Sequence, residues 1–253
     1  MSNPPGPRAP WPVGFPDVVI HAEPAARDNH PDFPAAKGGD RAAALRLAID
    51  LVSRDHAAGL AAFGGALLLP VTAYETTGFN AIPDAMAGEI GDYAGLGVVE
   101  GAVVQSNRVA HTRASGWHRL VAPALFEGPV EAGRDYILVD DHVGLGGTLA
   151  NLRGHVEAGG GRVVAMTTLT ESRDARTIAL RTETLSVLRS RHGPALEAFW
   201  QATFGHGLDC LTQVEAGYLA RQLSVDAIRK GMAEAAEQAR RRGLPAVEIE
   251  VGG

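Results

Sequence analysis

The chain has 253 residues, a net charge of −6 and 45% hydrophobic residues, which is typical of a globular protein. Its acidic balance gives no general basic field for nucleic acid, and no apolar run approaches the roughly 20 residues that span a bilayer. Residues 1–16 are rich in proline and lack the apolar core of a signal peptide. The single cysteine, Cys210, excludes an intramolecular disulfide and a cysteine-based zinc cluster. We therefore expect a cytoplasmic protein whose partners include neither a membrane nor a nucleic acid.

The N-terminal part of the chain divides into two segments. Residues 1–17 are expected to form an extended, frayed arm, because prolines recur along them. Residues 18–60 form the next segment, which combines a short strand at 18–20 with a polar, irregular stretch at 21–39.

A helix is predicted from residue 41 to about residue 56. Asp40 is suited to the N-cap position, where its carboxylate accepts a hydrogen bond from the first turn. Apolar residues recur there at helical spacing, so we expect a buried face made of Leu45, Ile49 and Val52, widened by Ala44, Leu47, Ala48 and Leu51.

Apolar runs bounded by turns predict the strands of a sheet that is buried on both faces. The runs occupy residues 66–71, 98–105, 136–139 and 162–170. A helix opening at Pro83 separates the first two runs. The last two, with a helix between them, imply a parallel, right-handed βαβ unit, so a ligand belongs at the carboxyl ends of the strands.

The most informative stretch joins the strand at 136–139 to the helix that follows. Two acids, Asp140 and Asp141, end the apolar run, and a glycine-rich turn leads into a helix at 149–158. Glycines let backbone N–H groups approach an anion, and the helix N-terminus adds partial positive charge, so this turn suits a phosphate. Carboxylates repel a phosphate, so we expect sugar hydroxyls or a divalent cation as their partners.

This order of strand, acid pair, glycine-rich turn, threonine and helix resembles the phosphoribosyl-diphosphate (PRPP) motif of the type I phosphoribosyltransferases. The resemblance implies that Asp140 and Asp141 bind the ribose 2′- and 3′-hydroxyls and a Mg²⁺ ion. It implies that the 5′-phosphate is bound by Gly144, Leu145, Gly146, Gly147 and Thr148. The implied fold is α/β and type I phosphoribosyltransferase-like, with a central mainly parallel sheet, flanking helices and a mainly α-helical C-terminal appendage.

The motif departs from the family pattern at two positions. Members of the family usually carry threonine at one or both positions corresponding to Gly144 and Leu145, and both hydroxyls are absent here. Purine-type members often have an aspartate, proposed as the general base, at the position of Gly144. The departures argue against a typical purine salvage enzyme and leave the general base unassigned. The alternative interpretation is a strand ending in a loop whose aspartates cap the next helix.

A second ligand contact is implied for the loop that follows residues 66–71. In the family this loop contacts pyrophosphate, and here the resemblance assigns that contact to Thr72, Ala73 and Tyr74. The helix opening at Pro83 resembles the one that follows this loop in the family. A polar loop without a ligand is the alternative for this region.

A closing loop is implied for the basic segment 106–119. In the resembled family a mobile loop at this place covers the bound diphosphate. Arg113 and Arg108 are the catalytic candidates, because cations on a lid offset the charge that develops on departing pyrophosphate. A solvated loop with scattered basic residues is the alternative.

The resemblance also divides the rest of the chain. Residues 61–171 form the phosphoribosyltransferase-like core, and residues 172–253 form a mainly helical extension in which Thr212 opens a helix with a capping box. Acceptor specificity in the family comes from a variable hood, which is sought here in residues 18–60, in the extension, or in both. The extension shapes the acceptor site or a dimer interface, and we expect a homodimer.

The predicted function is that of a phosphoribosyltransferase-like enzyme. It binds PRPP or a nucleoside monophosphate with Mg²⁺ as cofactor, and it transfers the 5-phosphoribosyl group to or from a nitrogenous, nucleobase-like acceptor with pyrophosphate as the partner product. Two alternatives stay open: a non-catalytic protein that senses PRPP or a nucleotide, and an N-glycosidic hydrolase of a nucleotide.

Overall fold

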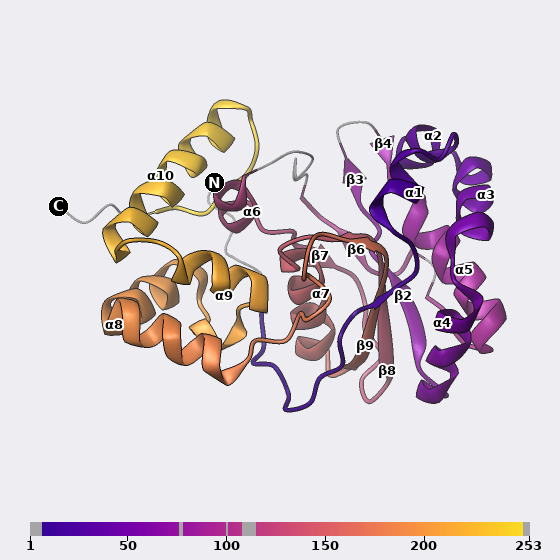
Figure 1. Cartoon of the computed structure of the whole chain (residues 1–253), viewed down its shortest axis with the longest axis horizontal. Helices are drawn as coiled ribbons and strands as arrows, with labels where there is room; N and C mark the ends of the chain where they lie inside the picture. The colour runs from indigo at the N-terminus through magenta and orange to yellow at the C-terminus, as the bar shows by residue number, and fades with distance from the viewer. Residues whose placement is uncertain (1–6, 76–77, 100, 108–114, 250–253) are drawn as a thin grey trace.

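A parallel sheet forms the centre of the computed structural model, which describes residues 7–75, 78–99, 101–107 and 115–249 (Figure 1). Every strand pairing in that sheet is parallel, and the strand order is β1-β9-β8-β2-β5. The strands are β1 (Val19–Ile20), β2 (Leu67–Pro70), β5 (Gly97–Val98), β8 (Asp135–Val143) and β9 (Arg162–Glu171). Two short antiparallel pairs join β3 (Tyr74–Glu75) to β4 (Gly78–Phe79) and β6 (Val104–Gln105) to β7 (Phe126–Glu127).

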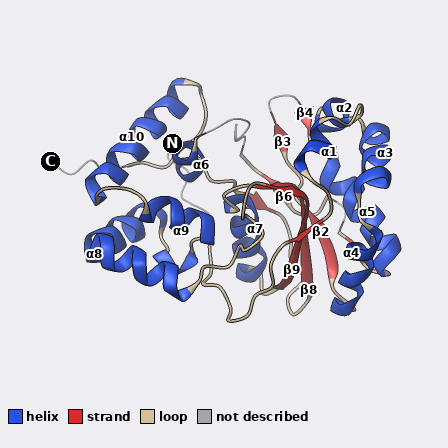
Figure 2. Cartoon of the chain, in the orientation of Figure 1, coloured by secondary structure: helices blue, strands red, loops and turns tan. Residues whose placement is uncertain are grey.

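Helices cover both faces of this sheet, as Figure 2 shows. Along β8 the side chains alternate between two cores: Ile137 and Val139 belong to one, and Tyr136 and Leu138 to the other. The first core is completed by α3 (Arg41–Leu51), α4 (Arg54–Gly59) and α5 (Ile82–Ala94), and the second by α7 (Gly147–Ala158). Burial on both faces explains why the strand reads as a continuous apolar run in the sequence.

The C-terminal part of the chain is helical and has a core of its own. It contains α8 (Thr182–Phe204), α9 (Gln213–Ala220) and α10 (Val225–Arg241), and α6 (Gly116–Val121) packs with them. Helix α8 is kinked where Gly193 takes a φ of 63° just before Pro194. Two short 3₁₀ helices are η1 (Leu60–Phe63) and η2 (Leu208–Cys210).

The predicted fold class is confirmed. The sheet is mainly parallel, helices flank it, and the C-terminal part is helical. The capping box is also confirmed, because the Thr212 hydroxyl accepts a hydrogen bond from the Glu215 amide while the Glu215 carboxylate accepts one from the Thr212 amide. Among the described residues, no helix combines the length and apolarity needed to cross a membrane.

The stretch expected to be irregular at 21–39 contains two short helices instead. They are α1 (Pro24–Asp28) and α2 (Phe33–Lys37), and each has a proline in its first turn. Proline is preorganised for that position, so two five-residue helices form where hydrophobic periodicity is too short to predict them.

The predicted buried face of the helix after Asp40 is confirmed for Ala44, Leu47, Ala48 and Val52 but wrong for Leu45 and Ile49. Asp40 caps the helix as expected. Leu45 and Ile49 are 48% and 52% exposed, whereas the buried side of α3 consists of Ala43, Ala44, Leu47 and Ala48. Three alanines and Leu47 therefore make the contact with neighbouring elements, whereas Leu45 and Ile49 face outward. The helix also stops at Leu51, because Val52 is extended and Ser53 caps the separate helix α4.

The described part of the N-terminal arm is extended but anchored, so the expectation of fraying is wrong for it. The Trp11 indole N–H donates to the Leu211 carbonyl at 2.7 Å. The Arg153 guanidinium donates to the carbonyls of Ala9 and Pro10 at 2.9 and 2.8 Å, and it lies over the Trp11 ring. The arm therefore joins α7 of the core to the helical C-terminal part.

Candidate functional site

The acid pair lies inside strand β8, near its carboxyl end, rather than beyond it. Asp140 pairs in register with Thr168 of β9, so the strand continues through both acids to Val143. Each aspartate is only 7% exposed. The Asp140 carboxylate accepts a hydrogen bond from the backbone N–H of Asp141 at 2.8 Å. The ladder therefore holds both carboxylates at the edge of the sheet where parallel strands present ligands.

Lys37, at the end of α2, balances the charge of this pair. Its Nζ donates to Oδ2 of Asp141 at 2.7 Å. Burial alone would raise the pKa of Asp141, but the charge and hydrogen bond of Lys37 outweigh burial and lower that pKa. Burial and the neighbouring charge of Asp141 instead raise the pKa of Asp140 well above its ordinary value. The pair therefore combines one readily ionised carboxyl with one that resists ionisation.

The turn after β8 is shaped by the C-terminal part of the chain as well as by its own glycines. Gly146 has a φ of 80°, which favours glycine, and helix α7 starts at the next residue. A Cβ on Gly146 would lie 3.1 Å from the Ile178 side chain and 3.2 Å from that of Thr212. The Thr212 hydroxyl donates to the Leu145 carbonyl at 2.5 Å. Thr212 thus both caps α9 and holds the turn in position.

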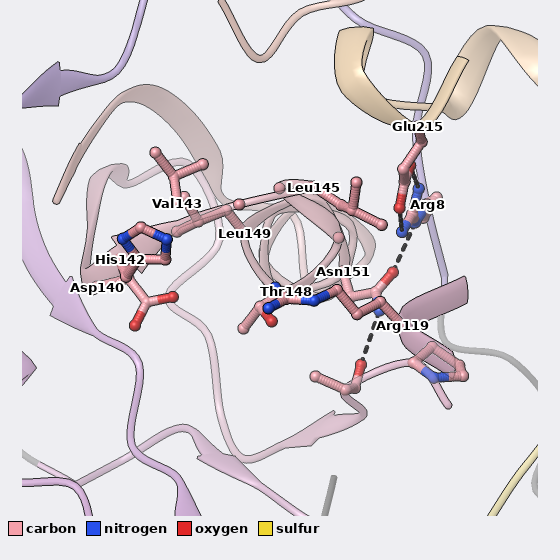
Figure 3. A pocket seen from close by; sticks show the side chains of 15 residues that line it. Arg8, Arg119, Asp140, His142, Val143, Leu145, Thr148, Leu149, Asn151 and Glu215 are labelled. Carbon is pink, nitrogen blue, oxygen red and sulfur yellow. Dashed lines mark hydrogen bonds and ion pairs between the residues drawn. The ribbon is translucent and has the colours of Figure 1, made fainter. Parts of the chain in front are cut away.

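A small cavity opens over this turn. Its volume is about 40 Å³, and residues 143–149 line it together with Arg8, Arg119, Asp140, His142 and Glu215, among others. At 10–15 Å³ per water this is room for roughly three waters, similar to the three terminal oxygens of a phosphate monoester. Figure 3 shows Asp140 and His142 at one end of the cavity and Arg8 and Glu215 at the other.

Arg8 reaches the cavity from the N-terminal arm and is held by two side chains. Its guanidinium donates to both carboxylate oxygens of Glu215, at 2.7 and 2.9 Å, and to Oδ1 of Asn151 at 2.6 Å. Burial would raise the pKa of Glu215, but the adjacent Arg8 lowers it. Because Arg8 and Glu215 are both nearly buried, this pair fixes the wall of the cavity beside the start of α7.

Arg119 reaches the cavity from α6. Its Nη1 lies 2.8 Å from the position that a Cβ on Gly144 would occupy. Burial lowers the pKa of Arg119. A guanidinium therefore lies directly against the first residue of the turn.

His142 is turned toward β9, although it also lines the cavity. Its two ring nitrogens lie 2.9 Å from the Thr170 hydroxyl and 3.1 Å from the Ser172 hydroxyl. Arg27 donates to the same Thr170 hydroxyl at 2.7 Å. Burial lowers the pKa of His142, and the positive charge of Arg27 lowers it further. The neutral imidazole is therefore favoured.

The other candidate residues lie in different places. Thr72 and Ala73 follow β2, the strand next to β8, so they reach the same edge of the sheet as the acid pair. Thr72 lines a second cavity, of about 840 Å³, rather than the small one. The backbone of Tyr74 belongs to β3. Arg108 and Arg113 lie outside the described residues.

Sequence reasoning missed three charged residues around the site, namely Lys37, Arg8 and Glu215, and it placed Arg119 only within the basic segment 106–119. One signal was available for Lys37, since it is one of two lysines in the chain. Glu215 was identified only as a helix-capping residue. Arg8 belongs to no local pattern that points to a ligand, because its partners Asn151 and Glu215 are distant in the sequence.

Comparison with known proteins gives relatives of greater length. No protein-family model matches the chain. The chain is 44% identical over 235 residues to "Protein TraN" of Escherichia coli, a match that covers 92% of this chain and 52% of that protein. It is 37% identical over 152 residues to an uncharacterized protein of Haemophilus influenzae, covering 59% of this chain and 34% of that protein. The chain thus spans about half, or about a third, of these relatives.

Solved structures that resemble the chain include three phosphoribosyltransferases. A crystal structure of adenine phosphoribosyltransferase has a TM-score of 0.34 at 18% identity, covering 51% of this chain and 70% of that one. The same enzyme from Leishmania tarentolae gives 0.31 at 17%, covering 50% and 62%. Hypoxanthine phosphoribosyltransferase of Trypanosoma cruzi gives 0.30 at 14%, covering 68% and 77%. These similarities assign no activity to the chain.

Proposed function

We propose that this chain binds a ribose 5-phosphate ligand, either PRPP or a nucleoside monophosphate, at the end of β8. We further propose that it transfers the 5-phosphoribosyl group between pyrophosphate and a nitrogenous base. One observation carries the proposal: two adjacent buried carboxylates lead directly into a glycine turn and a helix N-terminus at the ligand-presenting edge of a parallel sheet.

The parts of the site match the parts of such a ligand. The cavity of about 40 Å³ over residues 143–149 suits a single phosphate group. Backbone N–H groups at the start of α7 and two arginines provide donors there. Asp140 and Asp141 provide only acceptors when ionised, which suits ribose hydroxyls. The acids and the cavity adjoin through Asp140, as they must if one sugar phosphate touches both.

The donor set is compatible with Mg²⁺ bound together with a ligand. Mg²⁺ commonly uses one or two carboxylates plus substrate phosphates and waters. Within the described residues, no group of three or more histidine, cysteine or acidic side chains is arranged for a metal, so a protein-only cage is not the arrangement expected. Asp140 and Asp141 would be the protein ligands. When bound, the ion would supply positive charge near the diphosphate oxygens.

The reaction requires little covalent chemistry from the chain. A ring nitrogen forms a bond to the anomeric carbon while the bond to the pyrophosphate oxygen breaks, and the electron pair leaves with pyrophosphate. By analogy with other glycosyl transfers, the transition state resembles an oxocarbenium ion. The side chains would therefore act by holding the sugar and phosphate in place. Arg108 and Arg113 are proposed to offset charge on the departing pyrophosphate.

A binding protein without turnover is the second candidate, and Gly144 and Leu145 favour it because the hydroxyls usual in the family are missing. The test is a screen of nucleobases with PRPP and Mg²⁺, read by pyrophosphate release. Release with a base, but not without it, supports the transferase. PRPP binding without release in any combination identifies the binding protein, and absence of both contradicts the proposal.

A further inference from the structure

We infer that Arg119 supplies the phosphate contact that hydroxyls at positions 144 and 145 would otherwise supply. We infer further that residue 144 is glycine because the Arg119 guanidinium occupies the space of a side chain there. The inference rests on the proposed function only in taking the cavity over the turn as the place of the terminal phosphate. The contact itself concerns any phosphate monoester, so it can be tested separately.

The geometry explains a glycine that the backbone does not require. Gly146 has a positive φ, but Gly144 does not, so Gly144 is not needed for its conformation. A Cβ on Gly144 would lie 2.8 Å from Nη1 of Arg119, whereas the next nearest atoms, Cζ of Arg119 and Oγ of Ser172, are both 3.7 Å away. Arg119 is therefore the neighbour with which a side chain at 144 would collide.

The two arginines of the cavity lie at different places. Arg8 lies at one end (Figure 3), where it makes a two-point ion pair with Glu215. Arg119 lies at the turn itself, and in Figure 3 its side chain extends toward the middle of the cavity. A guanidinium matches phosphate oxygens with two parallel N–H donors, so one arginine can replace two hydroxyl groups.

The position of Arg119 is fixed by packing outside the motif. Its neighbours Leu120 and Val121 are buried in the core of the helical C-terminal part. Ser115 caps the helix by accepting the His118 amide, and the Trp117 ring packs edge-on against Tyr218 of α9, with ring centres 4.8 Å apart. The packing of α6 against the helical C-terminal part thus holds the backbone of Arg119 in place.

The experiment measures binding of inorganic phosphate and of ribose 5-phosphate by calorimetry, using the full chain. Arg119→Gln is expected to weaken binding of both ligands roughly 10- to 100-fold, because the hydrogen bonds of the charged guanidinium to the phosphate are lost. Arg119→Lys, which keeps the charge without the fork, should fall between. Arg134→Gln is the matched control, because Arg134 is exposed beside Glu131 and does not line the cavity.

A reciprocal substitution keeps the test valid if Arg119→Gln folds poorly. Gly144→Thr restores the hydroxyl but displaces the flexible end of Arg119, so alone it should weaken phosphate binding. In the Arg119→Gln background the same substitution meets no guanidinium and should strengthen binding instead. Gly144→Thr would thus change phosphate affinity in opposite directions in the two backgrounds. That result is expected only if residues 119 and 144 compete for the same space and the same phosphate contact.

Each outcome separates the inference from the proposed function. Unchanged phosphate affinity in Arg119→Gln, or no wild-type binding of either ligand, overturns the inference. If phosphate binding depends on Arg119 while ribose 5-phosphate binds no more tightly than phosphate, the inference stands and the proposed sugar site fails. Loss of ribose 5-phosphate binding in Arg119→Gln, with Arg134→Gln unchanged and the sign reversal present, supports both.

Discussion

Lys37 and Asp141 are 104 residues apart in the sequence, yet Nζ of the lysine lies 2.7 Å from Oδ2 of the aspartate. The contact ties the short helix α2 to the central strand at the candidate ligand site. Since Lys37 pairs with a buried carboxylate, its removal is expected to lower the stability of the strand end and to change the charge at the candidate site.

Lys37→Met is expected to lower the free energy of unfolding at pH 7 by roughly 1–3 kcal/mol, less than a fully buried pair because the Lys37 side chain is 25% exposed. The pKa of Asp141 is lowered in the folded state, so this stability is present above its unfolded pKa of 3.8 and is lost as pH falls through the folded value. Urea unfolding at pH 7 and in acid measures both effects. Lys230→Met, at an exposed position of α10, is the control; equal losses in the two variants would contradict the assignment.

Asp140→Asn is expected to stabilise the fold at neutral pH while it impairs ligand binding. The pKa of Asp140 is raised, so the folded state holds the proton more tightly than the unfolded state. The free energy of unfolding therefore falls as pH rises from 3.8 through the raised pKa of Asp140. At pH values above that pKa, the ionised carboxylate destabilises the folded state by its full amount. Asparagine removes that penalty, so a gain on the order of 1 kcal/mol is expected at pH 8 and none in acid. A variant less stable than wild type at pH 8 would show that the carboxylate is well satisfied.

Arg8→Met is expected to destabilise the protein by about 3–5 kcal/mol, because it leaves the buried Glu215 without its cation. The pKa of Glu215 is lowered, so the pair contributes above the unfolded value of 4.5 and its contribution disappears as pH falls through the folded value. Denaturant unfolding at neutral pH measures the loss. Arg134→Met, in an exposed pair with Glu131, should change stability by less than about 0.5 kcal/mol. A loss that persists in full at acid pH would rule out the ionic explanation.

Leu47→Ala should destabilise the chain by about 2–5 kcal/mol, whereas Leu45→Ala on the same helix should change stability by less than about 1 kcal/mol. Leu47 is fully buried and Leu45 is 48% exposed. The comparison uses the same substitution two residues apart, so helix propensity cancels. Similar losses at both positions, measured by thermal or urea unfolding, would mean that a partner covers the outer face of α3.

The parts of the fold that were predictable are those with local signals. The apolar runs at 66–71, 136–139 and 162–170 became β2, β8 and β9, and the capping box at Thr212 opened α9. Each depends on residues that are neighbours in the sequence, and so does the order of acid pair, glycine turn and helix.

The parts that were not predictable depend on contacts between distant residues. Arg8 and Glu215 are separated by 207 positions, and no local pattern connects them. The outward placement of Leu45 and Ile49 was missed for a different reason: a hydrophobic pattern gives large side chains more weight than the alanines that α3 buries. In the sequence, Gly144 is a departure from the motif. Only the structure places the Arg119 guanidinium within 2.8 Å of the position that a Cβ on Gly144 would occupy.

The central claim is that the two carboxylates of β8 hold a ribose whose phosphate lies over the turn. Titration calorimetry of PRPP with Mg²⁺, comparing wild type with the Asp140→Asn/Asp141→Asn variant, tests it most directly. Saturable binding by wild type and none by the folded variant is the predicted result. Equal affinity in both proteins, or no binding of PRPP or any nucleoside monophosphate by wild type, would contradict the claim.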